Sequence, residues 1–161
     1  MGYAERAGLP FEQGLVKNRY VARTFIQPSQ EMREKGVQMK LSAVRSIVSG
    51  KRLVLVDDSI VRGTTCLKIV KLLRAAGAKE IHVRIASPVM KHPCYYGVDT
   101  STEEELLCSH RNLDEACAMI EADSLGYISC EASVASTFGC SELCLACFNG
   151  EYPTALYDYE K

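Results

Sequence analysis

The stretch Leu53-Val-Leu-Val-Asp-Asp-Ser-Ile-Val-Arg-Gly-Thr-Thr65 carries the strongest structural signal in this sequence. Its apolar start predicts a buried strand over residues 52–57, followed by a short loop and the start of a helix. This order places Asp57 and Asp58 at the carboxyl end of the strand, where two carboxylates can accept hydrogen bonds from vicinal sugar hydroxyls. The loop offers backbone N–H groups, two threonine hydroxyls and the positive end of a helix dipole to a phosphate. The stretch therefore predicts a site for a ribose 5-phosphate.

An acidic pair at a strand end also has two other interpretations. It can be a solubilising strand end, or the acidic pocket of a domain with a phosphorylatable aspartate. The loop Ser59–Thr65 favours the sugar phosphate, because Gly63 permits close backbone approach and threonine hydroxyls can bind phosphate oxygens.

Length and composition are those of one ordinary globular domain. The chain has 161 residues, of which 47% are hydrophobic and 24% charged, and its net charge is -1. This balance gives no general attraction to nucleic acid or to an anionic membrane. Residues 17–52 are nevertheless locally basic, which predicts either an acidic ligand or a solvated charged loop. Against Glu31 and Glu34, this segment holds Lys17, Arg19, Arg23, Arg33, Lys35, Lys40, Arg45, Lys51 and Arg52.

The sequence predicts a cytoplasmic protein. It has no apolar run of the roughly 20 residues that span a bilayer, and its first residues lack the apolar core of a secretory signal. Eight cysteines in such a chain are expected to be free thiols, metal ligands or both, rather than a disulfide framework.

Alternating strand and helix signals predict an α/β fold with a parallel sheet and right-handed crossovers. The strand at 52–57 is a continuous apolar run, which predicts that it is central in the sheet and covered on both faces. The other expected elements are a helix tail at 3–8, a long loop at 10–40 with a short strand near 20–26, helices at 41–49, 65–76 and 112–121, and strands at 81–85 and 125–129.

The strand, acidic pair and Gly-Thr-Thr loop together resemble the phosphoribosyl pyrophosphate motif of the type I phosphoribosyltransferases. Four further stretches resemble the amidophosphoribosyltransferases of purine synthesis: residues 15–28, 92–97, 101–106 and 144–153. The resemblance implies a type I phosphoribosyltransferase-like parallel sheet flanked by helices, without the N-terminal strands and the glutaminase domain. It divides the chain into a partial phosphoribosyltransferase domain, 1–139, and a C-terminal cysteine-containing segment, 140–161.

The same resemblance assigns roles to individual residues. Asp57 and Asp58 are expected to hold the ribose hydroxyls and a Mg²⁺ ion. A flexible loop at 15–40 is expected to close over pyrophosphate, and Lys17 is also expected to meet feedback purine nucleotides. The 5-phosphate is expected to bind Ser59, Ile60, Val61, Arg62, Gly63, Thr64 and Thr65. The expected catalytic residues are Asp57, Asp58, Lys17, Arg19, Tyr20 and Arg23.

The cysteines add a second candidate centre. Cys144-x-x-Cys147 alone is also found in zinc and redox sites. The family resemblance implies that Cys94, Cys144 and Cys147 are three of the four ligands of a [4Fe–4S] cluster, with the fourth upstream of this chain, a position for which Cys140 is a possible substitute. The remaining cysteines, Cys66, Cys108, Cys117 and Cys130, are expected to be buried, and His82, His92 and His110 to be structural.

The function that the resemblance implies is the conversion of phosphoribosyl pyrophosphate and glutamine to 5-phosphoribosylamine, pyrophosphate and glutamate. The chain is expected to be a C-terminal part of such an enzyme, a homo-oligomer at full length, and weakly active or inactive without its glutaminase half. The alternatives are a regulatory module that binds the sugar pyrophosphate or a nucleotide without turnover, and an inactive fragment.

Overall fold

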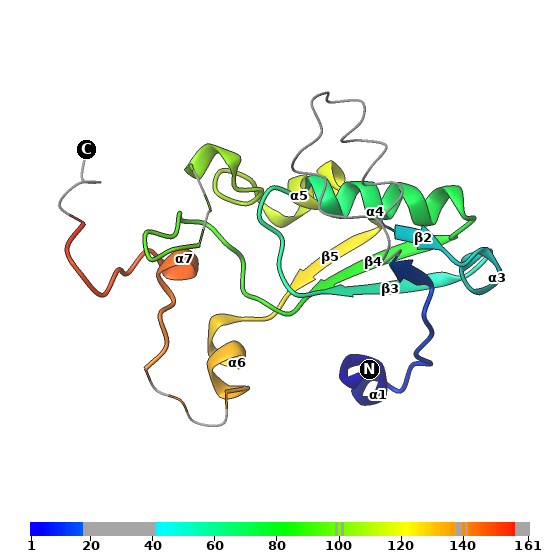
Figure 1. The fold of residues 1–161 in the computed structure, drawn as a ribbon, viewed down its shortest axis with the longest axis horizontal. Helices are drawn as coiled ribbons and strands as arrows, with labels where there is room; N and C mark the ends of the chain where they lie inside the picture. Colours follow the sequence, from blue (N-terminus) through cyan, green and yellow to red (C-terminus); the bar gives the residue numbers. More distant parts are fainter. Residues whose placement is uncertain (18–40, 99, 101, 138–139, 141, 157–161) are drawn as a thin grey trace. The chain divides into compact units, whose positions relative to one another are not determined.

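A computed structural model describes residues 1–17, 41–98, 100, 102–137, 140 and 142–156. Figure 1 traces its helices and strands, and the chain divides into two compact units. The first unit comprises Met1–Leu53 and Lys68–Ile81, and the second comprises Val54–Leu67 and His82–Lys161.

The main sheet has the order β3-β4-β5, and its parallel pairing confirms the predicted α/β fold. These strands are Arg52–Asp57, Glu80–Ile85 and Ser124–Tyr127, close to the predicted ranges. The predicted helix after the acidic pair is α4, Thr64–Ala75, and Gly77, two residues beyond its end, has a φ of 97°. Such a left-handed residue commonly ends a helix.

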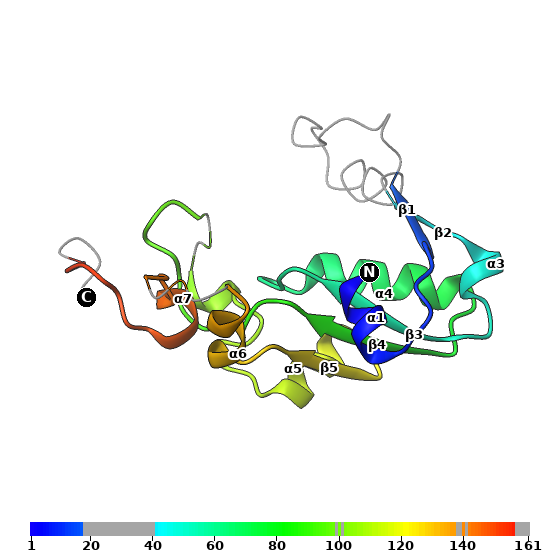
Figure 2. The same ribbon diagram turned by 90° about the horizontal axis from the view of Figure 1, so that it is seen from below.

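In the first unit, α1 (Gly2–Ala7) ends at Gly8 in the left-handed conformation, as predicted. The helix predicted at 41–49 is wrong over its first half. Leu41–Ala43 form β2, which pairs antiparallel with β1, Leu15–Lys17 (Figure 2). Only Arg45–Val48 are helical, as α3. Pairing with a strand that is distant in the sequence therefore overrides the local helical pattern. The strand predicted near 20–26 lies outside the described residues.

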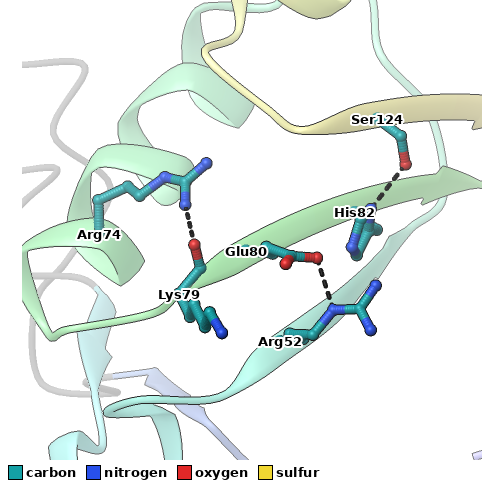
Figure 3. A network of polar contacts seen from close by, with 6 residues as sticks. All are labelled: Arg52, Arg74, Lys79, Glu80, His82 and Ser124. Atoms are coloured by element: carbon teal, nitrogen blue, oxygen red, sulfur yellow. Dashed lines mark hydrogen bonds and ion pairs between the residues drawn. The ribbon is translucent and has the colours of Figure 1, made fainter.

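Two polar contacts tie the ends of β3, α4 and β4 within this unit. Arg52 Nε donates to Glu80 Oε2 at 2.5 Å, and Arg74 Nη1 donates to the carbonyl of Lys79 at 2.8 Å (Figure 3). The first contact joins the starts of β3 and β4, and the second joins the end of α4 to the residue before β4.

In the second unit, β4 and β5 run parallel with His82 opposite Ser124 and Ile85 opposite Tyr127. Helix α5, Leu113–Met119, corresponds to the helix predicted at 112–121; it packs against β5 (Figures 1 and 2) and starts with a capping box. The Asn112 side chain accepts from the Glu115 N–H at 2.9 Å, and the Glu115 carboxylate accepts from the Asn112 N–H at 3.0 Å. The remaining elements are η2, Glu103–Glu105; α6, Cys130–Ala135; and α7, Ala146–Asn149.

The prediction that β3 is central and covered on both faces is wrong for the described chain. Burial alternates along the strand, and Val54 and Val56 are 38% and 48% exposed. The order β3-β4-β5 also places β3 at one edge of the sheet. An apolar run indicates a strand that can be covered on both faces, but the described residues cover only one face.

Separately, none of the helices in the described ranges is both long enough and apolar enough to cross a membrane.

Candidate ribose phosphate site

The candidate site starts where β3 ends. The backbone carbonyls of Asp57 and Asp58 accept hydrogen bonds from the N–H groups of Ala86 and Ser87, at 3.0 and 2.9 Å. The acidic pair is therefore held at the carboxyl end of β3, beside the carboxyl end of β4. In open α/β sheets, ligands bind at this edge.

The two carboxylates differ in their surroundings. Asp57 is half-buried and its Oδ1 accepts from the Asp58 N–H at 3.0 Å, whereas Asp58 is exposed and its Oδ1 accepts from Ser59 Oγ at 3.0 Å. Burial raises the pKa of Asp57 above its ordinary value; the hydrogen bond from the Asp58 N–H opposes this rise, and the negative charge of Asp58 adds to it. A cation bound beside it would favour the charged Asp57 and so oppose both of these effects.

Gly63 turns the chain from the loop into α4. Its φ of 77° lies in the left-handed region, and a methyl group there would lie 3.2 Å from both δ-methyl groups of Leu107. Helix α4 begins at the next residue, and the side chains of Thr64 and Thr65 are exposed in its first turn. Since the first N–H groups of a helix have no acceptor within the helix, this turn suits an anion.

Two thiols of the second unit, those of Cys66 and Cys108, are buried. Cys66, in the first turn of α4, is buried, and burial together with the charge of Asp57 and the neighbouring Cys117 raises its pKa to about 11. Tyr127, at the end of β5, lies with its hydroxyl 3.7 Å from the Sγ of Cys108, and burial raises the tyrosine pKa. These groups stay protonated at neutral pH and act as packing. Burial is confirmed for Cys66 and Cys108, whereas Cys117 and Cys130 are only half-buried.

The second candidate centre also lies in the second unit. The carbonyl of Cys147 accepts from the N–H groups of Lys91 and His92, at 2.9 and 3.1 Å, which ties the segment before Cys94 to α7. Burial raises the pKa of Cys147, and Cys94, Cys144 and Cys130 raise it further by their charges. Among the described residues, however, no group of three or more His, Cys, Asp or Glu side chains is arranged to hold a metal ion.

The remaining predicted residues have plainer surroundings. All eight cysteines are free, as expected, and Cys140 is exposed. His82 Nδ1 lies 2.9 Å from Ser124 Oγ across the β4–β5 pair, a structural contact (Figure 3). Lys17 is the exposed last residue of β1. The other expected residues of the flexible loop, Arg19, Tyr20 and Arg23, lie outside the described residues.

One segment of the site was missed from the sequence. Residues 103–108 run behind the loop Ser59–Gly63, and Glu105 and Leu107 contact it directly. From the sequence, residues 101–106 carried the family resemblance but no role at the site, because acidic residues followed by a Leu-Leu-Cys run are typical of any buried turn.

Comparisons with known proteins agree with this geometry. The profile of the family described as "Phosphoribosyl transferase domain" matches residues 4–117. Amidophosphoribosyltransferase from Bacillus subtilis (strain 168) is 56% identical over 163 residues, which cover 98% of this chain and 34% of that protein. The Staphylococcus aureus (strain Mu50) protein of the same name is 55% identical over 164 residues, 99% of this chain and 33% of that one.

Solved structures give the same result. Glutamine phosphoribosylpyrophosphate amidotransferase from B. subtilis, complexed with ADP and GMP, superposes with a TM-score of 0.85 at 56% identity, over 98% of this chain and 36% of that one. A structure of the allosteric regulatory enzyme of purine biosynthesis also gives 0.85, at 57% identity, over 98% of this chain and 35% of that one. The chain thus spans about a third of the length of the relatives that it matches.

Proposed function

Since the chain belongs to the phosphoribosyl transferase domain family, we propose that it binds the ribose 5-phosphate part of phosphoribosyl pyrophosphate at residues 57–65. One observation carries the proposal. The carboxylates of Asp57 and Asp58 stand at the end of β3, and the turn at Gly63 opens the N-terminus of α4 only a few residues later. Acceptors for sugar hydroxyls and donors for a phosphate are therefore built by one continuous segment.

For the whole enzyme, the proposed reaction is the one that gives the relatives their name, amidophosphoribosyl transfer. Ammonia released from glutamine attacks C1 of the sugar, the C1–N bond forms, the C1–O bond to pyrophosphate breaks, and pyrophosphate leaves with the bonding electrons. The product is 5-phosphoribosylamine, and the step opens purine synthesis. The sugar passes through an oxocarbenium-like state, whose positive charge the two carboxylates would stabilise from beneath the ribose. Ammonia is already a nucleophile, so the chain needs no dedicated base.

The leaving group requires positive charge. Lys17, Arg19 and Arg23, with Tyr20 between them, would supply it from the loop 15–40, and closing this loop would exclude water from the activated sugar. Lys17 is also proposed to contact purine nucleotides as feedback inhibitors; a B. subtilis relative was solved with ADP and GMP. A cytoplasmic location and a homo-oligomeric full-length enzyme belong to the same proposal.

A Mg²⁺ ion fits the acidic pair. Two adjacent carboxylates offer the oxygen ligands that this ion prefers. When bound, the ion would neutralise charge on pyrophosphate as the C1–O bond breaks. Asp57 and Asp58 would hold it and keep it next to the ribose hydroxyls.

A [4Fe–4S] cluster would take Cys94, Cys144 and Cys147 from this chain. The donor type fits, since such clusters bind cysteine thiolates and the charges of Cys94 and Cys144 act on Cys147, although the described side chains are not arranged around a metal ion. The fourth ligand remains the upstream residue, with Cys140 as the substitute proposed in this chain. Such a cluster would cross-link the loop after β4 to the C-terminal segment. Anaerobic reconstitution should give iron-dependent absorbance that Cys147→Ser abolishes; unchanged absorbance in the variant would exclude this ligand set.

A binding module without turnover is the second candidate function. It needs only the acidic pair and the loop at residues 57–65, whereas turnover also needs positive charge for the leaving group. Pyrophosphate release from the sugar pyrophosphate and ammonia separates the two functions, since only the enzyme produces it.

The shared binding step is tested by calorimetry. The chain is titrated with phosphoribosyl pyrophosphate in the presence of MgCl₂, and the same titration is repeated with Asp58→Asn. We expect heat of binding for the wild type and its loss in the variant, because Asp58 is exposed and available to the sugar. Equal heats in the two proteins would refute the assignment of the acidic pair.

A further inference from the structure

Arg62 lies in the middle of the candidate phosphate loop, yet its guanidinium is paired with the carboxylate of Glu105. Its Nε and Nη2 atoms both lie close to Glu105 Oε2, at 2.9 and 2.6 Å. Both side chains are about half exposed, at 46% and 47%. An arginine beside a phosphate site is ordinarily expected to bind the phosphate, but here the guanidinium is paired with a carboxylate of the protein.

The residues on either side of Arg62 contact the same segment. The Val61 carbonyl accepts from the Leu107 N–H at 2.8 Å, and Leu107 is only 2% exposed. On the other side, the Cα of buried Gly63 faces the δ-methyl groups of Leu107 so closely that an added methyl group would lie 3.2 Å from both. Three consecutive loop residues thus each contact Glu105 or Leu107, through an ion pair, a backbone hydrogen bond and an apolar contact.

We propose that Glu105 and Leu107 are positioning residues of the phosphate loop, and that Arg62 anchors the loop to them rather than binding the phosphate. The segment that they belong to, residues 103–108, is called the brace below. It fixes the loop backbone before ligand arrives, so that the N–H groups of the loop need no reordering on binding. The inference rests on the proposed function, because it assumes that this loop receives the sugar phosphate.

The test is a charge-reversal cycle read by calorimetry with phosphoribosyl pyrophosphate and MgCl₂. Arg62→Gln and Glu105→Gln should each weaken binding by up to about fivefold, the usual size for one exposed ion pair. The double variant should bind no more weakly than either single variant, because each substitution breaks the same Arg62–Glu105 ion pair. The reversed pair, Arg62→Glu with Glu105→Arg, should recover most of the affinity. Glu80→Gln is the matched control, because it breaks the Arg52–Glu80 pair of the other unit (Figure 3).

A direct phosphate ligand would behave differently. Arg62→Gln would then weaken binding, Glu105→Gln would leave it unchanged or strengthen it by releasing the guanidinium, and the reversed pair would stay weak. That result would overturn the positioning role, and so would wild-type affinity in both single variants.

Amide hydrogen exchange supplies a readout that needs no ligand. Glu105→Gln and Arg62→Gln should accelerate exchange of the Leu107 N–H, which donates to Val61, while Glu80→Gln should leave it unchanged. Unchanged exchange in all three variants would overturn the brace. If the wild type binds no phosphoribosyl pyrophosphate, the proposed function is refuted, and the positioning role with it. If the wild type binds it and both single variants bind it equally well, only the positioning role is overturned.

Discussion

Replacing Gly63 by alanine tests the geometry of the loop most directly. The residue has a φ of 77°, and the new methyl group would lie 3.2 Å from two carbons of Leu107 and 3.4 Å from Cγ2 of Ile120. Both neighbours are buried, at 2% and 1% exposure, so they have little room to move aside. The substitution therefore combines backbone strain with overpacking.

The two costs can be separated by a control. A residue other than glycine in the left-handed conformation costs about 1–2 kcal/mol, and overpacking a dense core costs about 1–3 kcal/mol. Gly8 has a φ of 65°, and nothing lies within 4 Å of a methyl group added there. Gly8→Ala should therefore lose only the first contribution, whereas Gly63→Ala should lose both, about 2–5 kcal/mol in all. The effect of alanine on the unfolded chain is common to both variants and cancels in the comparison.

Urea denaturation of the wild type and the two variants measures the free energies of unfolding. Gly63→Ala should lose at least about 1 kcal/mol more than Gly8→Ala, the low end of the overpacking cost. Its affinity for phosphoribosyl pyrophosphate should also fall, since the shift needed to admit the methyl group moves the loop. Equal destabilisation by the two substitutions would refute the close packing of Gly63 on the brace.

Three further predictions concern other parts of the second unit. Burial raises the pKa of Asp57, so the wild type has its full stability below pH 3.8, the ordinary pKa, and loses stability as the pH rises through the raised pKa. Urea denaturation should therefore show Asp57→Asn to be more stable than the wild type near neutral pH, and the difference should vanish in acid. A difference that stays constant with pH would contradict this. In the native protein a thiol reagent followed by mass spectrometry should label exposed Cys140 quickly and Cys66 hardly at all, because Cys66 is buried with its pKa raised to about 11; equal labelling would contradict the burial. Asn112→Ala should cost about 1 kcal/mol in thermal unfolding by breaking the capping box of α5, and Asn112→Gly only a few tenths; equal losses would show that the cap is not formed.

The parts of the fold that were predicted correctly depend on local signals. The strand at 52–57 is set by a run of apolar residues that stops at two carboxylates, and the start of α5 is set by a side chain and a backbone group three residues apart. Both signals lie within a few residues of the structure that they determine. The acidic pair and the turn at Gly63 were found in the same way, because the segment that forms them is continuous.

The parts that were missed depend on residues distant in the sequence. Leu41–Ala43 form a strand only because Leu15–Lys17 pair with them. The brace reaches the phosphate loop from more than 40 residues downstream, as the separation of Arg62 and Glu105 shows. The alternating exposure of β3 depends on which elements cover the sheet, and a run of valines and leucines gives no information about that.

The exposed valines of β3 have a practical consequence. Within the part of the chain that the structure describes, β3 is an outer strand of its sheet, and such a strand can pair with the same strand of another molecule. Val54 and Val56 present an apolar surface on which the paired sheets can stack. Concentrated solutions of this chain should therefore polymerise on standing, and lysine in place of Val56 should delay the growth of fibrils.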